Sequence, residues 1–172
     1  MFSPREPFLE RGWPGRIEGE TVIHLAAQTL QAFFTGGGKA REHAEYPLAD
    51  VVFRAPVLHP PAVRIFDEAG DFVFANPAAI KAAGEDPGVE GAEQVECVAG
   101  IVGAAGAIGG FTPLVEWTAP ALPGVKARDF ALALGPFLVT PDEETPEGVD
   151  WERLVAHAAA NTRLYPGDLI AA

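Results

Sequence analysis

Cysteine is nearly absent from this chain, which carries Cys97 as its one thiol among 172 residues. A single cysteine excludes an intrachain disulfide and a zinc site built from cysteines. Structural disulfides are typical of oxidising compartments, so their exclusion favours a reducing one. We therefore expect a cytoplasmic protein.

Basic residues are scarce as well, with 12 lysines and arginines against 24 acidic residues and a formal net charge of −12. Nucleic acids and anionic membranes attract basic surfaces, so this balance argues against both as partners. Long hydrophobic runs are also missing, because the most apolar window, residues 95–111, is rich in glycine and too short to cross a bilayer. No N-terminal stretch pairs basic residues with an apolar segment, so no signal peptide is predicted.

Glycine and proline are abundant, with 19 and 16 residues respectively. This composition is typical of many turns and short strands rather than of a helix bundle. With 48% hydrophobic residues, the chain is not a disordered tail and is large enough for one ordinary core. We expect a mainly β (α+β) protein with few short helices. Residues 1–50 form a small hairpin and helix module in this prediction, and residues 51–172 form a β-rich body.

Local patterns predict the individual elements. A hairpin is expected over Gly12–Leu25, and an amphipathic helix over Asp150–Asn161. Asn76 and Pro77 are typical of a helix start and predict one short helical turn, which Gly84 closes. The main strands of the body are expected at residues 51–58, 63–66, 72–75, 95–102, 107–115 and 137–140.

Residues 109–140 carry the most distinctive order of residues in the chain. A Gly-Phe-Thr strand leads to Glu-Trp-Thr-Ala at residues 116–119, followed by Lys-x-x-Asp-Phe at residues 126–130 and Leu-Gly-Pro at residues 134–136. This order resembles the core of the fumarylacetoacetate hydrolase family. The hairpin at residues 15–25 and the Pro-Gly-Asp strand at residues 164–170 extend the resemblance nearly end to end.

The resemblance implies a mixed β-roll built around one divalent metal, Mg²⁺ or Mn²⁺, in a chain that usually forms homodimers. Family members hydrolyse, decarboxylate or isomerise 2-oxo acids such as acylpyruvates and oxaloacetate. Glu116 stands where the family's aspartate holds the metal, and Lys126 matches the lysine that polarises the substrate's oxo group. The resemblance thus implies Lys126 as the catalytic residue, with Lys126 and Thr118 binding the substrate. A cation at Lys126 would stabilise a developing enolate.

The strand that supplies the family's other two ligands departs from its Glu-x-Glu pattern. Alternate positions of a strand share a face, so such a pair offers two oxygens to a hard cation. Counting back from Gly103 places Val95 and Cys97 at these positions. A slip of one residue places Gln94 and Glu96 there instead. Both alignments stay open at the level of the sequence.

If a metal binds, we expect Glu96, Glu116 and Glu93 to supply its oxygens, with Lys126 facing the same cavity. Glu93 lies on the face opposite Glu96 in a regular strand, so a bulge would be needed to bring both to one side. The alternative is that these three acids are strand-end residues that face water, which is the common fate of acidic side chains.

Other parts of the family's site are missing from the sequence. Pro120 replaces an arginine, residues 64–70 contain no lid histidine, and no Gly-Thr-Pro segment follows the strand at residues 164–170. Two hypotheses therefore stand. The chain is either a weak metal-dependent hydrolase or decarboxylase of 2-oxo acids, or a degenerate relative that acts as a binding or subunit-interaction protein.

Overall fold

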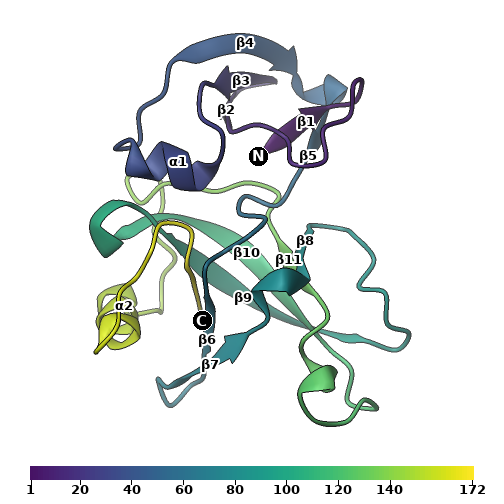
Figure 1. Ribbon diagram of the computed structural model, residues 1–172, viewed down its shortest axis with the longest axis vertical. Helices are drawn as coiled ribbons and strands as arrows, with labels where there is room; N and C mark the ends of the chain where they lie inside the picture. Colours follow the sequence, from purple (N-terminus) through teal and green to yellow (C-terminus); the bar gives the residue numbers. More distant parts are fainter.

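The structure, a computed structural model, describes residues 1–172 and consists of an N-terminal module above a curled mixed sheet (Figure 1). Strands β2 (Gly15–Glu18), β3 (Thr21–Leu25) and β4 (Glu42–Pro47) form an antiparallel three-stranded sheet. Next to it, β1 (Phe2–Pro4) pairs with β5 (Val51–Phe53). The expected hairpin at the start of the chain is therefore present as β2 and β3.

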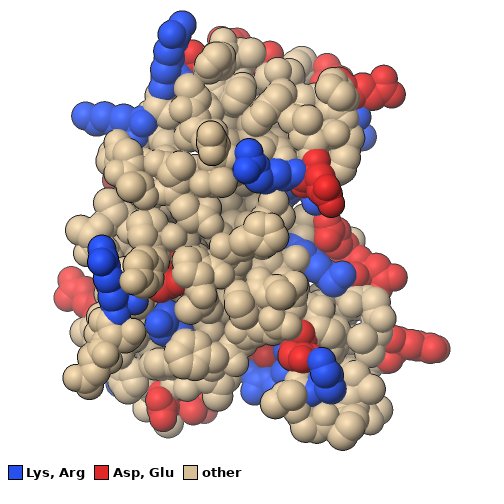
Figure 2. Space-filling view, viewed as in Figure 1, with Lys and Arg blue, Asp and Glu red and all other residues tan.

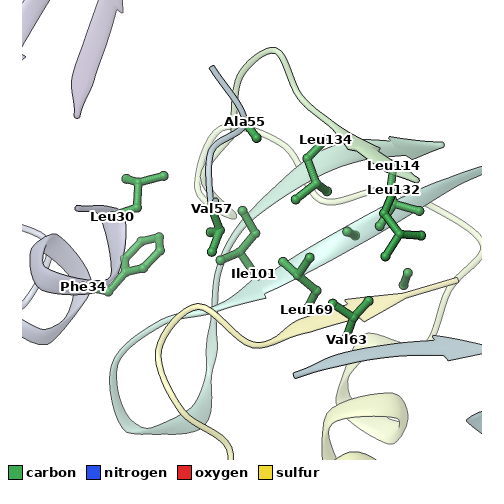
Figure 3. Close-up of a cluster of buried hydrophobic side chains, with 12 residues drawn as sticks. Leu30, Phe34, Ala55, Val57, Val63, Ile101, Leu114, Leu132, Leu134 and Leu169 are labelled. Carbon is green, nitrogen blue, oxygen red and sulfur yellow. The ribbon is translucent and has the colours of Figure 1, made fainter. Parts of the chain in front are cut away.

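A short helix, α1 (Leu30–Thr35), connects the N-terminal module to the body. The Thr29 hydroxyl accepts a hydrogen bond from the Ala32 amide, which satisfies one free donor of the first turn. The helix ends at Gly36, and Gly37 follows with a φ of 78°, a conformation that glycine adopts without steric penalty. Leu30 and Phe34 are buried on the face that points to the main sheet (Figure 3).

The body is a seven-stranded sheet in the order β7-β6-β12-β9-β10-β11-β8. The pairs β6–β12 and β8–β11 are parallel, and the remaining pairs are antiparallel. This mixed arrangement with few short helices confirms the predicted fold class. The strands are β6 (Val63–Phe66), β7 (Phe72–Ala75), β8 (Ile80–Ala82), β9 (Glu93–Val102), β10 (Ile108–Thr118), β11 (Leu132–Leu134) and β12 (Leu169–Ala171).

The long hairpin of β9 and β10 forms the centre of the sheet, and its side chains alternate between two packed faces. Leu114 lies on the inner face, where it contributes to a cluster that fills the curl of the sheet beneath α1 (Figure 3). Phe111 lies on the outer face. The centroid of its ring is 4.9 Å from the ring centroid of Trp151 in α2 (Trp151–Ala159). The inner cluster comprises Leu30, Phe34, Ala55, Val57, Val63, Ala99, Ile101, Leu114, Leu132, Leu134, Leu169 and Ala171.

Helix α2 lies within the range predicted for an amphipathic helix, and it covers the outer face of the sheet. The Asp150 carboxylate accepts a hydrogen bond from the Arg153 amide and so caps the first turn. Trp151, Leu154 and Ala158 are buried against the sheet. No helix in the chain is both long and apolar enough to cross a membrane. Acidic and basic side chains are scattered over the face shown in Figure 2, without a continuous basic patch.

Short single-turn helices join the strands at four places. They are η1 (Leu48–Asp50), η2 (Pro77–Ala79), η3 (Ala104–Gly106) and η4 (Gly124–Ala127). In η2, the Asn76 side chain accepts a hydrogen bond from the Ala78 amide, so the predicted capped turn is confirmed. The turn is shorter than expected, because the chain continues from it directly into β8 rather than running as a helix to Gly84.

Two predicted strands differ from the structure. The strand expected at residues 51–58 ends at Phe53, and the following residues Ala55 and Val57 are buried in the inner cluster on either side of Pro56. Residues 137–140 form one isolated bridge between Phe111 and Val139 rather than a strand, between the flanking Pro136 and Pro141. Proline lacks a donor for a sheet ladder, and prolines lie close to both segments, at Pro56 after β5 and on either side of residues 137–140.

The boundary at residues 50 and 51 stays a prediction. Strand β5 lies after this boundary and pairs with β1 before it, while α1 from the N-terminal side packs into the inner cluster. The two parts therefore share contacts, although each has a sheet of its own.

We expect Leu114→Ala to lower the free energy of unfolding by about 2–5 kcal/mol, because it leaves a cavity among fully buried side chains. The matched control is Leu122→Ala, since Leu122 is 37% exposed and its truncation should change stability by only about 0.5 kcal/mol. Urea unfolding followed by tryptophan fluorescence measures both. Equal losses in the two variants would contradict the assignment of the inner cluster.

Candidate functional site

Glu116 is the one acidic residue that β10 places inside the curl of the sheet. It lies on the inner face two positions beyond Leu114, and the whole residue is only 3% exposed. Its partner on β9 is Val95, and its partner on β11 is Leu132. A carboxylate among such neighbours needs a positive partner, because an isolated buried charge is strongly disfavoured.

Arg128 supplies that positive partner. Its Nε donates to Oε1 of Glu116 and its Nη2 donates to Oε2, both at 2.8 Å. Two parallel charge-assisted hydrogen bonds of this kind are the strongest arrangement available to an arginine and a carboxylate. The hydrogen bonds to Glu116 raise the pKa of the Arg128 guanidinium, against the lowering effect of its partial burial. The side chain of Glu116 is 4% exposed and that of Arg128 is 50% exposed, so the pair runs from the interior to the surface.

The loop that carries Arg128 is held to β10 by its backbone. The Ala119 amide donates to the Ala127 carbonyl at 2.7 Å, and the Trp117 amide donates to the Ala131 carbonyl at 3.1 Å. Helix η4 lies between these contacts and ends with the Arg128 amide donating to Val125. These bonds place the guanidinium at the end of the curl, within hydrogen-bond distance of Glu116.

The structure does not bring the expected metal ligands together. Glu96 pairs with Val115 on β10, so it lies on the opposite face of the sheet from Glu116. Glu93 pairs with Thr118 and does share the face of Glu116, but it is exposed at the end of the strand. No group of three histidine, cysteine or acidic residues in the chain is arranged to hold a metal ion. The strand pairing thus places Glu96 and Glu116 on opposite faces, contrary to the shared site expected from the one-residue slip.

The counted positions, Val95 and Cys97, are the ones that share the face of Glu116, with Cys97 partly buried and Val95 48% exposed. Neither offers an oxygen. Burial, with a smaller contribution from the charge of Glu116, raises the pKa of the Cys97 thiol from its ordinary value of 9.0 to about 12. Without a metal, the sulfur is thus protonated at neutral pH. Mg²⁺ and Mn²⁺ prefer several oxygen ligands, so the residues around Glu116 do not fit either ion.

Lys126 lies in the loop that carries Arg128, and its ion pair is with Asp129 rather than with Glu116. Its Nζ donates to Oδ2 of Asp129 at 2.8 Å, and its side chain is 69% exposed. The Asp129 carbonyl in turn accepts from the Asn76 side chain at 2.9 Å. The basic group that reaches the buried acid is therefore Arg128, two residues further along. Thr118 lies on the face of Glu116, at the outer end of β10.

Sequence reasoning missed Arg128, although one signal could have found it. Val95 and Cys97 occupy the positions of the two missing acids, so a divalent metal would have too few ligands there. Glu116 would then lack the metal ion that neutralises the corresponding acid in the family. Either Glu116 is exposed or a nearby basic residue must replace that cation. The segment Lys126-Ala127-Arg128-Asp129 offers two basic residues within reach, and the second one fills this role.

Two surface hollows lie away from Glu116. One of about 610 Å³ lies between α1 and the body and is lined in part by Arg11, Gln31 and His59. The other, of about 470 Å³, lies on the outer face of the sheet beside Gln94 and Trp117. None of the residues expected to form the metal site lines either hollow.

No family model and no curated protein sequence matches the chain. Solved structures do match it over nearly its whole length. Maleylpyruvate hydrolase from Sphingobium sp. SYK-6 has a TM-score of 0.76 at 20% identity, covering 99% of this chain and 87% of that one. The same enzyme in complex with manganese(II) and pyruvate also has a TM-score of 0.76, at 19% identity, with the same coverage. 2-keto-3-deoxy-D-arabinonate dehydratase complexed with magnesium and 2,5-dioxopentanoate has a TM-score of 0.70 at 15% identity, covering 99% and 85%.

The chain therefore has the fold of the fumarylacetoacetate hydrolase family, and the resemblance stated from the sequence is confirmed at this level. At identities of 20% and below, the likeness establishes the fold and not the chemistry.

We expect Arg128→Leu to lower the free energy of unfolding by about 1–3 kcal/mol, because it leaves the Glu116 carboxylate buried without a partner. This range is below that for a fully buried pair because Arg128 is half-exposed. The double variant Glu116→Leu/Arg128→Leu should be less destabilised than Arg128→Leu alone. Chemical denaturation of these two variants and of Glu116→Leu alone gives the coupling free energy.

A matched control for this cycle is Arg16→Leu. Arg16 forms ion pairs with Glu18 and Glu42, but its side chain is 51% exposed and those of its partners are 58% and 56% exposed. Its loss should change stability by about 0.2–1 kcal/mol. A double variant as unstable as Arg128→Leu would mean that the Glu116–Arg128 pair makes no special contribution.

Proposed function

We propose that the chain binds small 2-oxo acids at the end of the curl marked by Glu116 and Arg128, without a divalent metal. Its turnover as a hydrolase or decarboxylase is weak or absent. The observation that carries this proposal is the bidentate Glu116–Arg128 pair, which uses both oxygens of the single buried acid. A metal ion at Glu116 would have to displace Arg128. The neighbouring side chains of Val95 and Cys97 would offer it no oxygen ligand.

The ligand class is supported by the solved structures that share the fold. One of them holds manganese(II) and pyruvate, and another holds magnesium and 2,5-dioxopentanoate. Both organic molecules are small and carry an oxo group. For this chain, Thr118 and Lys126 are the proposed contacts to such a ligand, because Thr118 shares the face of Glu116 and Lys126 lies in the loop that carries Arg128.

Weak turnover is expected because an enolate mechanism needs several parts at once. A held cation, a positioned base and an anchor for the substrate carboxylate all have to act on one transition state. Lys126 is already paired with Asp129, and no histidine lies in residues 64–70. Losing a general base typically lowers a rate by about 10²–10⁴-fold, and losing an electrostatic stabiliser lowers it by about 10²–10³-fold.

The second candidate is a metal-dependent hydrolase or decarboxylase of acylpyruvates or oxaloacetate that uses Mg²⁺ or Mn²⁺. Coverage of 99% of the chain by a maleylpyruvate hydrolase and a 2-oxo acid dehydratase favours it. It requires Glu116 to release Arg128 and further oxygen ligands to come from Glu93, from Glu96 after a rearrangement of β9, or from a partner chain. A role in subunit interaction without any small ligand remains the third possibility.

Calorimetric titration with pyruvate separates these candidates. We expect binding in EDTA that does not change when Mn²⁺ replaces the EDTA, and no uptake of Mn²⁺ by the protein alone. An acylpyruvate and oxaloacetate should turn over no faster than in a protein-free control containing the same metal. Metal-dependent turnover that Glu116→Ala abolishes would contradict the proposal and favour the second candidate.

We further propose that the chain is a cytoplasmic homodimer that does not bind nucleic acids or membranes. Strand β7 is an edge strand of the main sheet and exposes Val73 and Phe74, which are 51% and 68% accessible. Apolar side chains at an unpaired edge favour a partner that covers them. Light scattering after size exclusion should give twice the chain mass of 18.1 kDa, and a monomer mass at micromolar concentration would contradict the dimer.

A further inference from the structure

We propose that the Arg128 guanidinium takes the place of a divalent metal at Glu116 and that its free edge anchors the carboxylate of the ligand. The choice of a 2-oxo acid as ligand rests on the function proposed above. The anchoring role itself rests on the geometry of the Glu116–Arg128 pair and on the residues beside it.

Arg128 has hydrogen-bond donors that Glu116 does not use. A guanidinium carries five N–H donors in a planar fork. Glu116 takes one from Nε and one from Nη2, and the side chain makes no other hydrogen bond in the structure. The edge formed by Nη1 and Nη2 is therefore unused, and it belongs to a side chain that is half-exposed. This edge has the spacing that binds a planar carboxylate through two parallel hydrogen bonds.

Glu116 fixes the orientation of the Arg128 guanidinium. Glu116 is buried and holds Nε and Nη2 at 2.8 Å each, which fixes both the position and the plane of the guanidinium. A fixed donor group loses little conformational entropy when a ligand binds, whereas a free surface arginine has to be ordered. Glu116 thus acts as a positioning residue and Arg128 as the group that touches the ligand.

Two residues of β9 on the face of Glu116 carry no charge. Val95 and Cys97 lie on the same face as Glu116, at the positions where the family resemblance places two metal-binding acids. With a divalent metal, those two acids and Glu116 would together leave a net charge of −1. With one guanidinium in its place, the same three acids would leave −2, whereas Glu116 alone balances it. The apolar residues on β9 and the arginine in the loop are therefore consistent with each other as parts of one site.

The net charge of the pair is zero, and Lys126 is paired with Asp129. The site therefore recognises a carboxylate through directed hydrogen bonds rather than through an excess of positive charge. We expect selectivity for a carboxylate over a neutral group of the same shape, with modest affinity.

Pyruvate is the probe, and pyruvamide is its uncharged counterpart. Wild-type protein in EDTA should bind pyruvate, whereas pyruvamide should bind at least about tenfold more weakly, a difference of about 1.4 kcal/mol. Arg128→Lys keeps the charge and removes the fork, so pyruvate should bind to it at least about tenfold more weakly. The control Arg16→Lys changes another half-exposed arginine and should leave the affinity unchanged.

A measurement on the wild type makes the test independent of how well the Arg128→Lys variant folds. The side-chain Nε–H resonance of Arg128, assigned by its loss in that variant or by nuclear Overhauser contacts to Glu116, should shift as pyruvate is added. The resonance of Arg16 should not. Room-temperature electron paramagnetic resonance of Mn²⁺ should show the free-ion signal undiminished by the protein.

The outcomes separate the two proposals. If wild-type protein does not bind pyruvate in EDTA, the proposed function fails together with the anchor. If pyruvate binds but the Arg128 resonance stays unchanged and Arg128→Lys binds equally well, the anchor is overturned and the proposed function stands. If the protein takes up Mn²⁺ stoichiometrically, the replacement of the metal by Arg128 is overturned.

Discussion

A carboxylate that is buried inside a curled sheet must be neutralised where it lies, and Glu116 imposes this constraint on one end of the molecule. In a medium of low dielectric constant, two opposite charges attract strongly, but removing each from water is also unfavourable. The balance is favourable only when the partner satisfies the carboxylate completely, as the two 2.8 Å hydrogen bonds from Arg128 do. Arg128 consequently holds the loop after β10 across the end of the curl. Val95 and Cys97, two β9 residues on the same face, carry no further negative charge that would need a partner.

Much of the fold could be predicted from the sequence because it depends on repeating patterns. The Pro-Gly-Asp turn before β12, the capped helix α2 and the hairpin of β2 and β3 each carry their own local signal. Prolines limited the accuracy of the strand boundaries. Pro56 ends the extended segment after β5 early, and residues 137–140 form a single bridge where a strand was expected. After β5 the hydrophobic pattern was correct about burial, since Ala55 and Val57 are buried, whereas Phe137 in the second segment is 46% exposed.

The candidate site could be predicted less completely, for two physical reasons. The position of Glu116 follows from the order of motifs, but the residues that face it depend on the register between β9 and β10. A slip of one residue exchanges every side chain between the two faces, so Glu96 was assigned to the wrong side. Arg128 lies in a loop, where no periodicity tells which of two nearby basic side chains turns inward. Lys126 fits the motif, yet it pairs with Asp129, and the longer planar guanidinium of Arg128 reaches the acid.

The order of strands in the main sheet has a bearing on how the chain acquires its structure. Strand β12 is the last strand in the sequence, yet it lies between β6 and β9, and the buried contact from Arg64 to Asp168 joins residues 104 positions apart. During synthesis, β6 and β9 therefore remain as open edges until residues 169–171 have emerged. Loop closure over such a separation is entropically unfavourable, and folding dominated by such distant pairings is slow. The exposed edges of the nascent chain are thus a hazard for aggregation that the finished sheet no longer has.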